Sequence, residues 1–127
     1  MGYGLLAEVC TIVTIIAIVM LYRYVFAKGL SDTDYAAFGD RTGMIVGIVG
    51  GTIYTFLFAR LVTGRLANRQ VAHGIVVAVA AIALSVGGSL AGHRGLPSGY
   101  ALASFLKLGA GALAGFLGAR SRPPLPA

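Results

Sequence analysis

Ionisable side chains inside apolar stretches are the residues of this chain that could carry chemistry. Glu8, Arg60 and His73 each lie within a few residues of one end of a long apolar segment. Ionisable groups inside a membrane are costly to desolvate and are functional candidates by default. If the segments cross a bilayer in alternating directions, all three residues reach a similar depth on the cytoplasmic side. We therefore predict an intramembrane polar cluster of Glu8, Arg60 and His73, the alternative being that each side chain separately reaches the lipid headgroups.

A second polar level lies near the middle of the apolar segments. Lys107 is so far inside the last segment that its amine cannot easily reach either membrane surface. Tyr54 and Thr14 fall at about the same depth, so we expect these three side chains to form a midplane polar group. No acidic residue lies at that depth, and Glu8 is about one and a half helical turns away. A lysine in this position loses its charge, or it needs water or an acidic group from another subunit.

The sequence lacks the motifs of common enzyme and cofactor sites. It contains neither a glycine-rich phosphate-binding motif nor the HExxH metalloprotease motif. His73 and His93 lie near opposite ends of one apolar segment, so one chain cannot clamp a haem between them. A single histidine in an oligomer still leaves haem or pigment binding open. We predict that the protein is not an enzyme and has no catalytic residue, no metal site and no cofactor.

The composition around these residues is that of an integral membrane protein. The 127 residues are 57% hydrophobic and only 11% charged, whereas an average soluble domain has about 25% charged residues. A soluble enzyme, a disordered tail and a soluble nucleic-acid binder are therefore excluded. The net charge of +6 does not indicate nucleic acid as a partner, because the basic residues lie mostly at the ends of apolar segments, as in membrane proteins.

Four apolar segments are long enough to cross a bilayer. They cover about residues 3–27, 43–63, 71–92 and 99–119, each close to the roughly 20 residues that a spanning helix requires. We predict an all-α membrane protein in which residues 1–127 form one domain, a four-helix transmembrane bundle with short loops. Between the first two spans, Ser31 or Asp32 is expected to cap a short interfacial helix.

The basic residues that flank the spans predict the orientation. Five arginines lie on the side that holds both termini, against four lysine and arginine residues on the other side. Because basic residues are more frequent on the cytoplasmic side, we predict a multi-pass protein of a bacterial inner membrane with both termini in the cytoplasm.

Glycines at intervals of four residues indicate close helix packing, because small residues let helix backbones approach one another in lipid. The candidate packing residues occur on three of the four segments: Gly43, Gly47, Gly51, Gly88, Gly92, Gly111 and Gly115. They provide more small-residue surface than one bundle core needs. This surplus predicts helix partners outside the chain.

A glycine- and arginine-containing pattern over the last three spans resembles small four-span bacterial membrane proteins of uncharacterised function. The residues that carry it are Gly50-Gly51, Ala59-Arg60, Ala72-His73-Gly74 and Gly118-Ala119-Arg120. The first span, with Glu8, lies outside the resemblance. The resemblance implies a four-helix fold and transfers no active site.

Together these observations predict a non-catalytic membrane protein that acts as a packing or accessory subunit of a homo- or hetero-oligomeric complex. Its expected partners are the lipid bilayer and other transmembrane helices, and not nucleic acid. The alternative is a minimal ion or small-solute channel or transporter formed by an oligomer, in which Glu8, Arg60, His73 and Lys107 line a path. The two hypotheses differ in whether the polar side chains are paired within protein or face a cavity.

Overall fold

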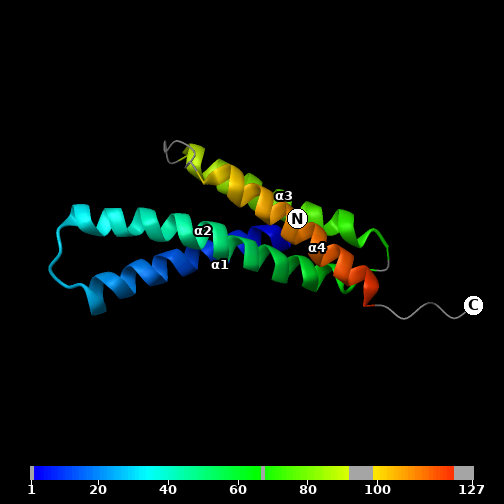
Figure 1. Ribbon diagram of the computed structural model, residues 1–127, viewed down its shortest axis with the longest axis horizontal. Coiled ribbons are helices and arrows are strands. Elements are labelled where there is room, and N and C mark those ends of the chain that lie inside the picture. Colours follow the sequence, from blue (N-terminus) through cyan, green and yellow to red (C-terminus); the bar gives the residue numbers. More distant parts are fainter. Residues whose placement is uncertain (1, 67, 92–98, 122–127) are drawn as a thin grey trace, which may run out of the picture.

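The chain folds into a bundle of four long helices (Figure 1). The computed structural model describes residues 2–66, 68–91 and 99–121. The helices are α1 (Gly2–Leu21), continued by the π-helical turn η1 (Tyr22–Phe26), α2 (Asp32–Thr63), α3 (Gln70–Ala91) and α4 (Tyr100–Arg120). All four are long and apolar enough to cross a membrane. A helix satisfies its own backbone hydrogen bonds, which lipid cannot do, so these apolar segments are helical despite their many β-branched residues.

The helices form two antiparallel hairpins. In Figure 1, α1 and α2 run alongside each other from the end of the molecule that holds residues 27–31, and α3 and α4 lie across the other half of this pair. Helix α4 packs against both α2 and α3, while α1 packs against α2 and, less extensively, against α3. Residues from all four helices can therefore meet where the two hairpins cross.

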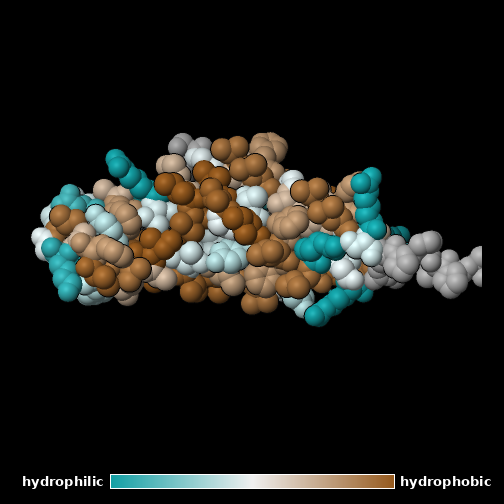
Figure 2. Space-filling model, turned by 60° about the horizontal axis from the view of Figure 1, so that its bottom comes forward, coloured by the Kyte–Doolittle hydropathy of each residue, from teal (hydrophilic) through white to brown (hydrophobic). Residues whose placement is uncertain are grey.

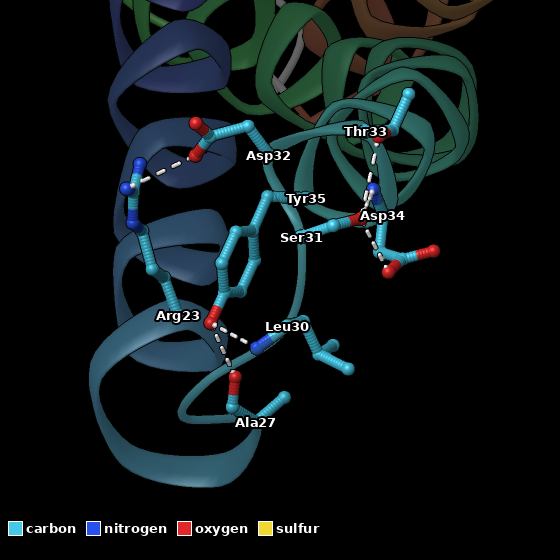
Figure 3. Close-up of polar contacts among 8 residues, drawn as sticks. All are labelled: Arg23, Ala27, Leu30, Ser31, Asp32, Thr33, Asp34 and Tyr35. Atoms are coloured by element: carbon cyan, nitrogen blue, oxygen red, sulfur yellow. Dashed lines mark hydrogen bonds and ion pairs between the residues drawn. The ribbon is translucent and has the colours of Figure 1, made fainter.

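Helix α2 is longer than the sequence predicts, because it begins at Asp32 and not near residue 43. Ser31 is its N-cap, as expected, and its hydroxyl accepts a hydrogen bond from the backbone N–H of Asp34 at 3.2 Å (Figure 3). Asp32 and Asp34 in the first turn complement the positive end of the helix dipole. The expected separate interfacial helix is wrong, since the capped helix continues without a break into the span.

Aromatic and polar contacts join the end of α1 to the start of α2. The hydroxyl of Tyr35 donates to the carbonyl of Ala27 at 2.6 Å and accepts from the N–H of Leu30 at 3.2 Å (Figure 3). The guanidinium of Arg23 lies 4.9 Å from the centre of the Tyr35 ring and 3.4 Å from a carboxylate oxygen of Asp32. These contacts set the register of the first hairpin.

The interior of the bundle is made of small residues and the lipid-facing surface of large ones. The most deeply buried apolar residues are alanines, including Ala59, Ala78 and Ala114, whereas Phe105 is 74% exposed. Hydrophobic side chains cover much of the face shown in Figure 2, and hydrophilic ones gather towards its two ends. This arrangement is typical of transmembrane bundles, in which close backbone approach replaces burial of large side chains.

Candidate functional site

A buried ion pair lies where the two hairpins cross. The amine of Lys107 on α4 is 2.6 Å from Oε2 of Glu8 on α1. The side chains of Lys107 and Glu8 are only 5% and 9% exposed, respectively. Each charge offsets the desolvation of the other, so two residues that are individually costly in a membrane can both be ionised.

Ser85 on α3 connects the two charged groups. Its hydroxyl donates to Oε1 of Glu8 and accepts a hydrogen bond from the Lys107 amine at 3.1 Å. Both carboxylate oxygens of Glu8 are thus bonded, as are two of the three N–H groups of the lysine. We call these three residues, one from each of α1, α3 and α4, the Glu8–Ser85–Lys107 triad.

The remaining helix, α2, contributes the space that the lysine occupies. A Cβ atom on Gly51 would lie 2.8 Å from Cε and 3.3 Å from Nζ of Lys107. A side chain at this position would require the end of the Lys107 side chain to shift. The glycine on α2 leaves room for the amine in its present position.

A cavity of about 90 Å³ adjoins the triad and extends toward the start of α4. Besides the triad, it is lined by residues of α2 and of the first turn of α4: Gly43, Met44, Gly47, Ile48, Gly99, Tyr100 and Ala103. The hydroxyl of Tyr100 donates to the carbonyl of Ile82 at 2.9 Å. The cavity has room for roughly three water molecules, well below the roughly 300 Å³ or more of a drug-sized ligand site.

The expected grouping of Glu8 with Arg60 and His73 is not formed. Arg60 donates to the hydroxyl of Ser121 at 2.6 Å. His73 is exposed, and its Nδ1 lies 3.0 Å from the carbonyl of Arg69.

The reason is an offset between α1 and α2. The ring of Tyr3 already lies beside that of Phe58, with their centres 6.4 Å apart. Because the two helices are antiparallel, Glu8 is roughly 7.5 Å further along, in the direction away from Arg60. Residue counts from the helix ends therefore place Glu8 too close to the surface.

Thr14 and Tyr54 lie together, as expected, but apart from the triad. Their hydroxyls are 2.9 Å from each other, and that of Thr14 also donates to the carbonyl of Cys10 at 2.8 Å. Both residues line a second hollow, of about 320 Å³, between α1 and α2. Lys107 forms its hydrogen bonds with Glu8 and Ser85 instead.

Apart from Gly51, the candidate packing glycines that the structure describes fall into two groups. Gly111 and Gly115 lie in the α3–α4 contact, where a Cβ on Gly111 would collide with the carbonyl of Gly74 and one on Gly115 would lie 2.5 Å from Cα of Val71. A Cβ on Gly43, Gly47 or Gly88 would meet no atom within 4 Å in the described part of the chain. Gly92 and His93 lie outside the described residues.

Ser85 is the site residue that sequence reasoning missed. Serines in spanning helices usually bond to their own backbone, so its type carries no signal. The sequence did contain an indication that Glu8 pairs with Lys107. Glu8 is the one acidic residue inside the predicted spans, because the three aspartates lie in the loop between the first two spans. Within the described residues, no group of three or more His, Cys, Asp or Glu side chains could hold a metal ion.

Comparison with known proteins identifies no relative. The chain matches no protein-family model, no curated protein and no solved structure. The resemblance carried by the glycine pattern therefore identifies no family, and the four helices able to span a membrane stand on the structure alone.

Proposed function

We propose that this protein moves a small ion across the membrane and that the Glu8–Ser85–Lys107 triad is the site through which the ion passes. The observation that carries the proposal is a buried, hydrogen-bonded pair of opposite charges at the end of a cavity. Ionisable groups inside membranes commonly mark ion and proton pathways.

Stability alone is a weak reason for such a pair. Replacing a buried ion pair by well-packed apolar residues is often neutral or stabilising. A pair that served only to lock helices together would also be expected to be closely packed. Here the glycines Gly43 and Gly47 leave space beside the pair, and Gly51 admits the lysine. The space and the charges together support passage of an ion.

The second candidate function is the packing or accessory subunit predicted above. Its support is the open space over Gly88 on α3, because an exposed glycine surface favours association with another helix in lipid. Lys107 no longer indicates a partner subunit, because Glu8 of the same chain supplies the acidic group that another subunit was expected to provide.

Ion flux in proteoliposomes tests the proposed function. Purified wild-type protein should raise the permeability of liposomes to at least one of H⁺, Na⁺, K⁺ or Cl⁻ above that of empty liposomes. Lys107→Met should abolish the increase, and Glu8→Gln should abolish any part of it that is carried by H⁺. Arg120→Met, which removes an exposed charge from the end of the same helix as Lys107, should leave it unchanged.

Two results would contradict transport. One is wild-type flux no greater than that of empty liposomes for all four ions. The other is flux that Glu8→Gln and Lys107→Met reduce no more than Arg120→Met, in samples of equal monodispersity.

A further inference from the structure

We infer that the cavity binds a small monovalent anion at the Lys107 amine and that the anion binds together with a proton taken up by Glu8. This inference names the substrate class of the proposed transport site and so rests on that function, although binding can be tested without transport. The first support is the amine itself, which donates to Glu8 and Ser85 and forms no third hydrogen bond within the described part of the chain. The same amine lines the cavity.

The charges around the cavity favour an anion over a cation. Lys107 and Glu8 are the charged residues in its lining. The lining also includes Gly99 and Tyr100 at the N-terminal end of α4, the end to which the helix dipole gives a partial positive charge. A cation would meet this positive end and the lysine, and both oxygens of the one carboxylate already accept hydrogen bonds.

Charge balance couples the anion to a proton. With Glu8 ionised, the carboxylate neutralises Lys107 and competes directly with any anion. When a proton binds at Oε2, this oxygen no longer competes for the amine, and the buried ammonium is left without a counter-ion. An anion from the cavity then restores neutrality, so one proton and one anion bind as a neutral pair. Leaving the ammonium unpaired would instead leave its desolvation uncompensated.

Glu8 is the group that takes up the proton. The groups that face it are Lys107 and Tyr100 from α4 and Ser85 from α3, and α2 presents Gly51 and Gly47, which do not titrate. The lysine ammonium has no site for a further proton, and the tyrosine and serine hydroxyls are neutral. The carboxylate is therefore the group that can accept one.

The size of the cavity limits the anion to a small one. A volume of about 90 Å³ accommodates roughly three waters, hence a halide ion with one or two waters of hydration. A phosphorylated metabolite or a drug-sized carboxylate is larger than this volume. The class is therefore that of halides and similarly small monovalent anions, and chloride is the suitable probe.

Chloride titration of the detergent-solubilised protein tests the inference. The buffer contains gluconate in place of chloride, and the chloride-dependent shift in unfolding temperature reports binding to the folded state. The apparent Kd of the wild type should fall about tenfold for each unit by which the pH decreases while Glu8 takes up its proton. In weakly buffered solution, chloride should also cause the uptake of about one proton per anion bound.

Two pairs of variants provide the controls. Glu8→Gln mimics the protonated carboxyl, so it should bind chloride with a Kd that does not depend on pH and is at least tenfold lower than that of the wild type at pH 8. Lys107→Met should show no chloride-dependent shift. Gly47→Val fills the cavity and should weaken chloride binding at least tenfold, whereas Gly88→Val, at a position with equally open space on α3, should not.

Each outcome separates the inference from the transport function. Chloride binding with the expected pH dependence, but without flux, would support the anion site and refute transport. Flux of H⁺, Na⁺ or K⁺ that chloride does not alter, together with no chloride binding, would refute the anion site and leave transport intact. If Lys107→Met does not fold, the proton-uptake measurement on the wild type still tests the inference. Addition of chloride without proton uptake would overturn it.

Discussion

At the scale of single residues, the chain contains two buried charges that depend on each other. Lys107 and Glu8 are at hydrogen-bond distance and almost fully buried, and Ser85 bonds to both of them. Removing one member leaves the other as an unpaired polar group in a low-dielectric region, whereas removing both leaves none. The energetic value of the pair is therefore visible only when single and double variants are compared.

We expect Glu8→Gln and Lys107→Met each to lower the free energy of unfolding, and the double variant to lower it by less than the sum. The coupling energy should be about 0.5–3 kcal/mol, the range for residues in one hydrogen-bond network. Reversible unfolding in mixed detergent micelles measures all four proteins under the same conditions. Additive effects of the two substitutions would show that Glu8 and Lys107 do not interact in the folded protein.

At the scale of helices, glycines have two different structural roles. On α3 and α4 they allow backbones to touch, as at Gly74 and Gly111, where a Cβ atom on either residue would collide with the other residue's carbonyl. On α2 they leave room for the side chain of Lys107 and for the cavity beside it. The same spacing of four residues accompanies both roles, so spacing alone does not distinguish them.

This difference predicts opposite effects of alanine at two glycines. Gly111→Ala should destabilise the protein by about 1–3 kcal/mol, because overpacking against backbone atoms cannot be relieved by a side-chain rotation. Gly88→Ala, for which the added methyl group meets nothing within 4 Å, should be neutral or stabilising by up to about 1 kcal/mol through helix propensity. The same unfolding assay checks both variants, and equal effects would contradict the α3–α4 contact.

Substitution at Gly88 also tests the packing-subunit candidate. If this surface binds another helix, Gly88→Ile should reduce the size of the oligomer in mild detergent, as measured by light scattering. An unchanged size together with wild-type ion flux would favour transport.

At the scale of the whole molecule, the antiparallel arrangement places the α1–α2 connection at one end of the bundle and the end of α4 at the other (Figure 1). Hydrophobic residues cover much of the surface between these ends (Figure 2). A bundle of this shape in a bilayer exposes the two ends to opposite compartments. The cavity beside the triad extends toward the start of α4, and thus toward the end that holds the α1–α2 connection.

The excess of basic residues on the side of the termini predicts which compartment each end faces. In a Cys10→Ser background, a cysteine at Thr33 should react with a membrane-impermeant reagent added outside intact cells. A cysteine at Ser121 should react only after the cells are opened. Both positions are exposed in the structure, so burial does not limit labelling. Reaction of both cysteines in intact cells would contradict the four-span topology, and the reverse pattern would place the cavity on the cytoplasmic side.

Much of the fold follows from the sequence alone, because lipid imposes a simple rule. An apolar segment of about 20 residues that enters a bilayer must be helical to satisfy its backbone, so the four spans could be predicted from composition and length. The cap at Ser31 could also be predicted, since capping depends only on neighbouring residues. What local rules did not show is that α2 continues unbroken from this cap through residue 63.

The site itself was decided by tertiary structure. Whether Glu8 meets Arg60 or Lys107 depends on the offset of α1 along α2 and on the rotation of each helix, and neither quantity is encoded in residues adjacent to Glu8. The contact of Tyr3 with Phe58 and the backbone contact between Gly74 and Gly111 show how these helix pairs are aligned. The partners in these contacts are more than thirty residues apart in the chain. Composition therefore determined that charged groups lie inside a membrane bundle, and only helix packing, a non-local property, determined which of them are paired and that a cavity lies beside them.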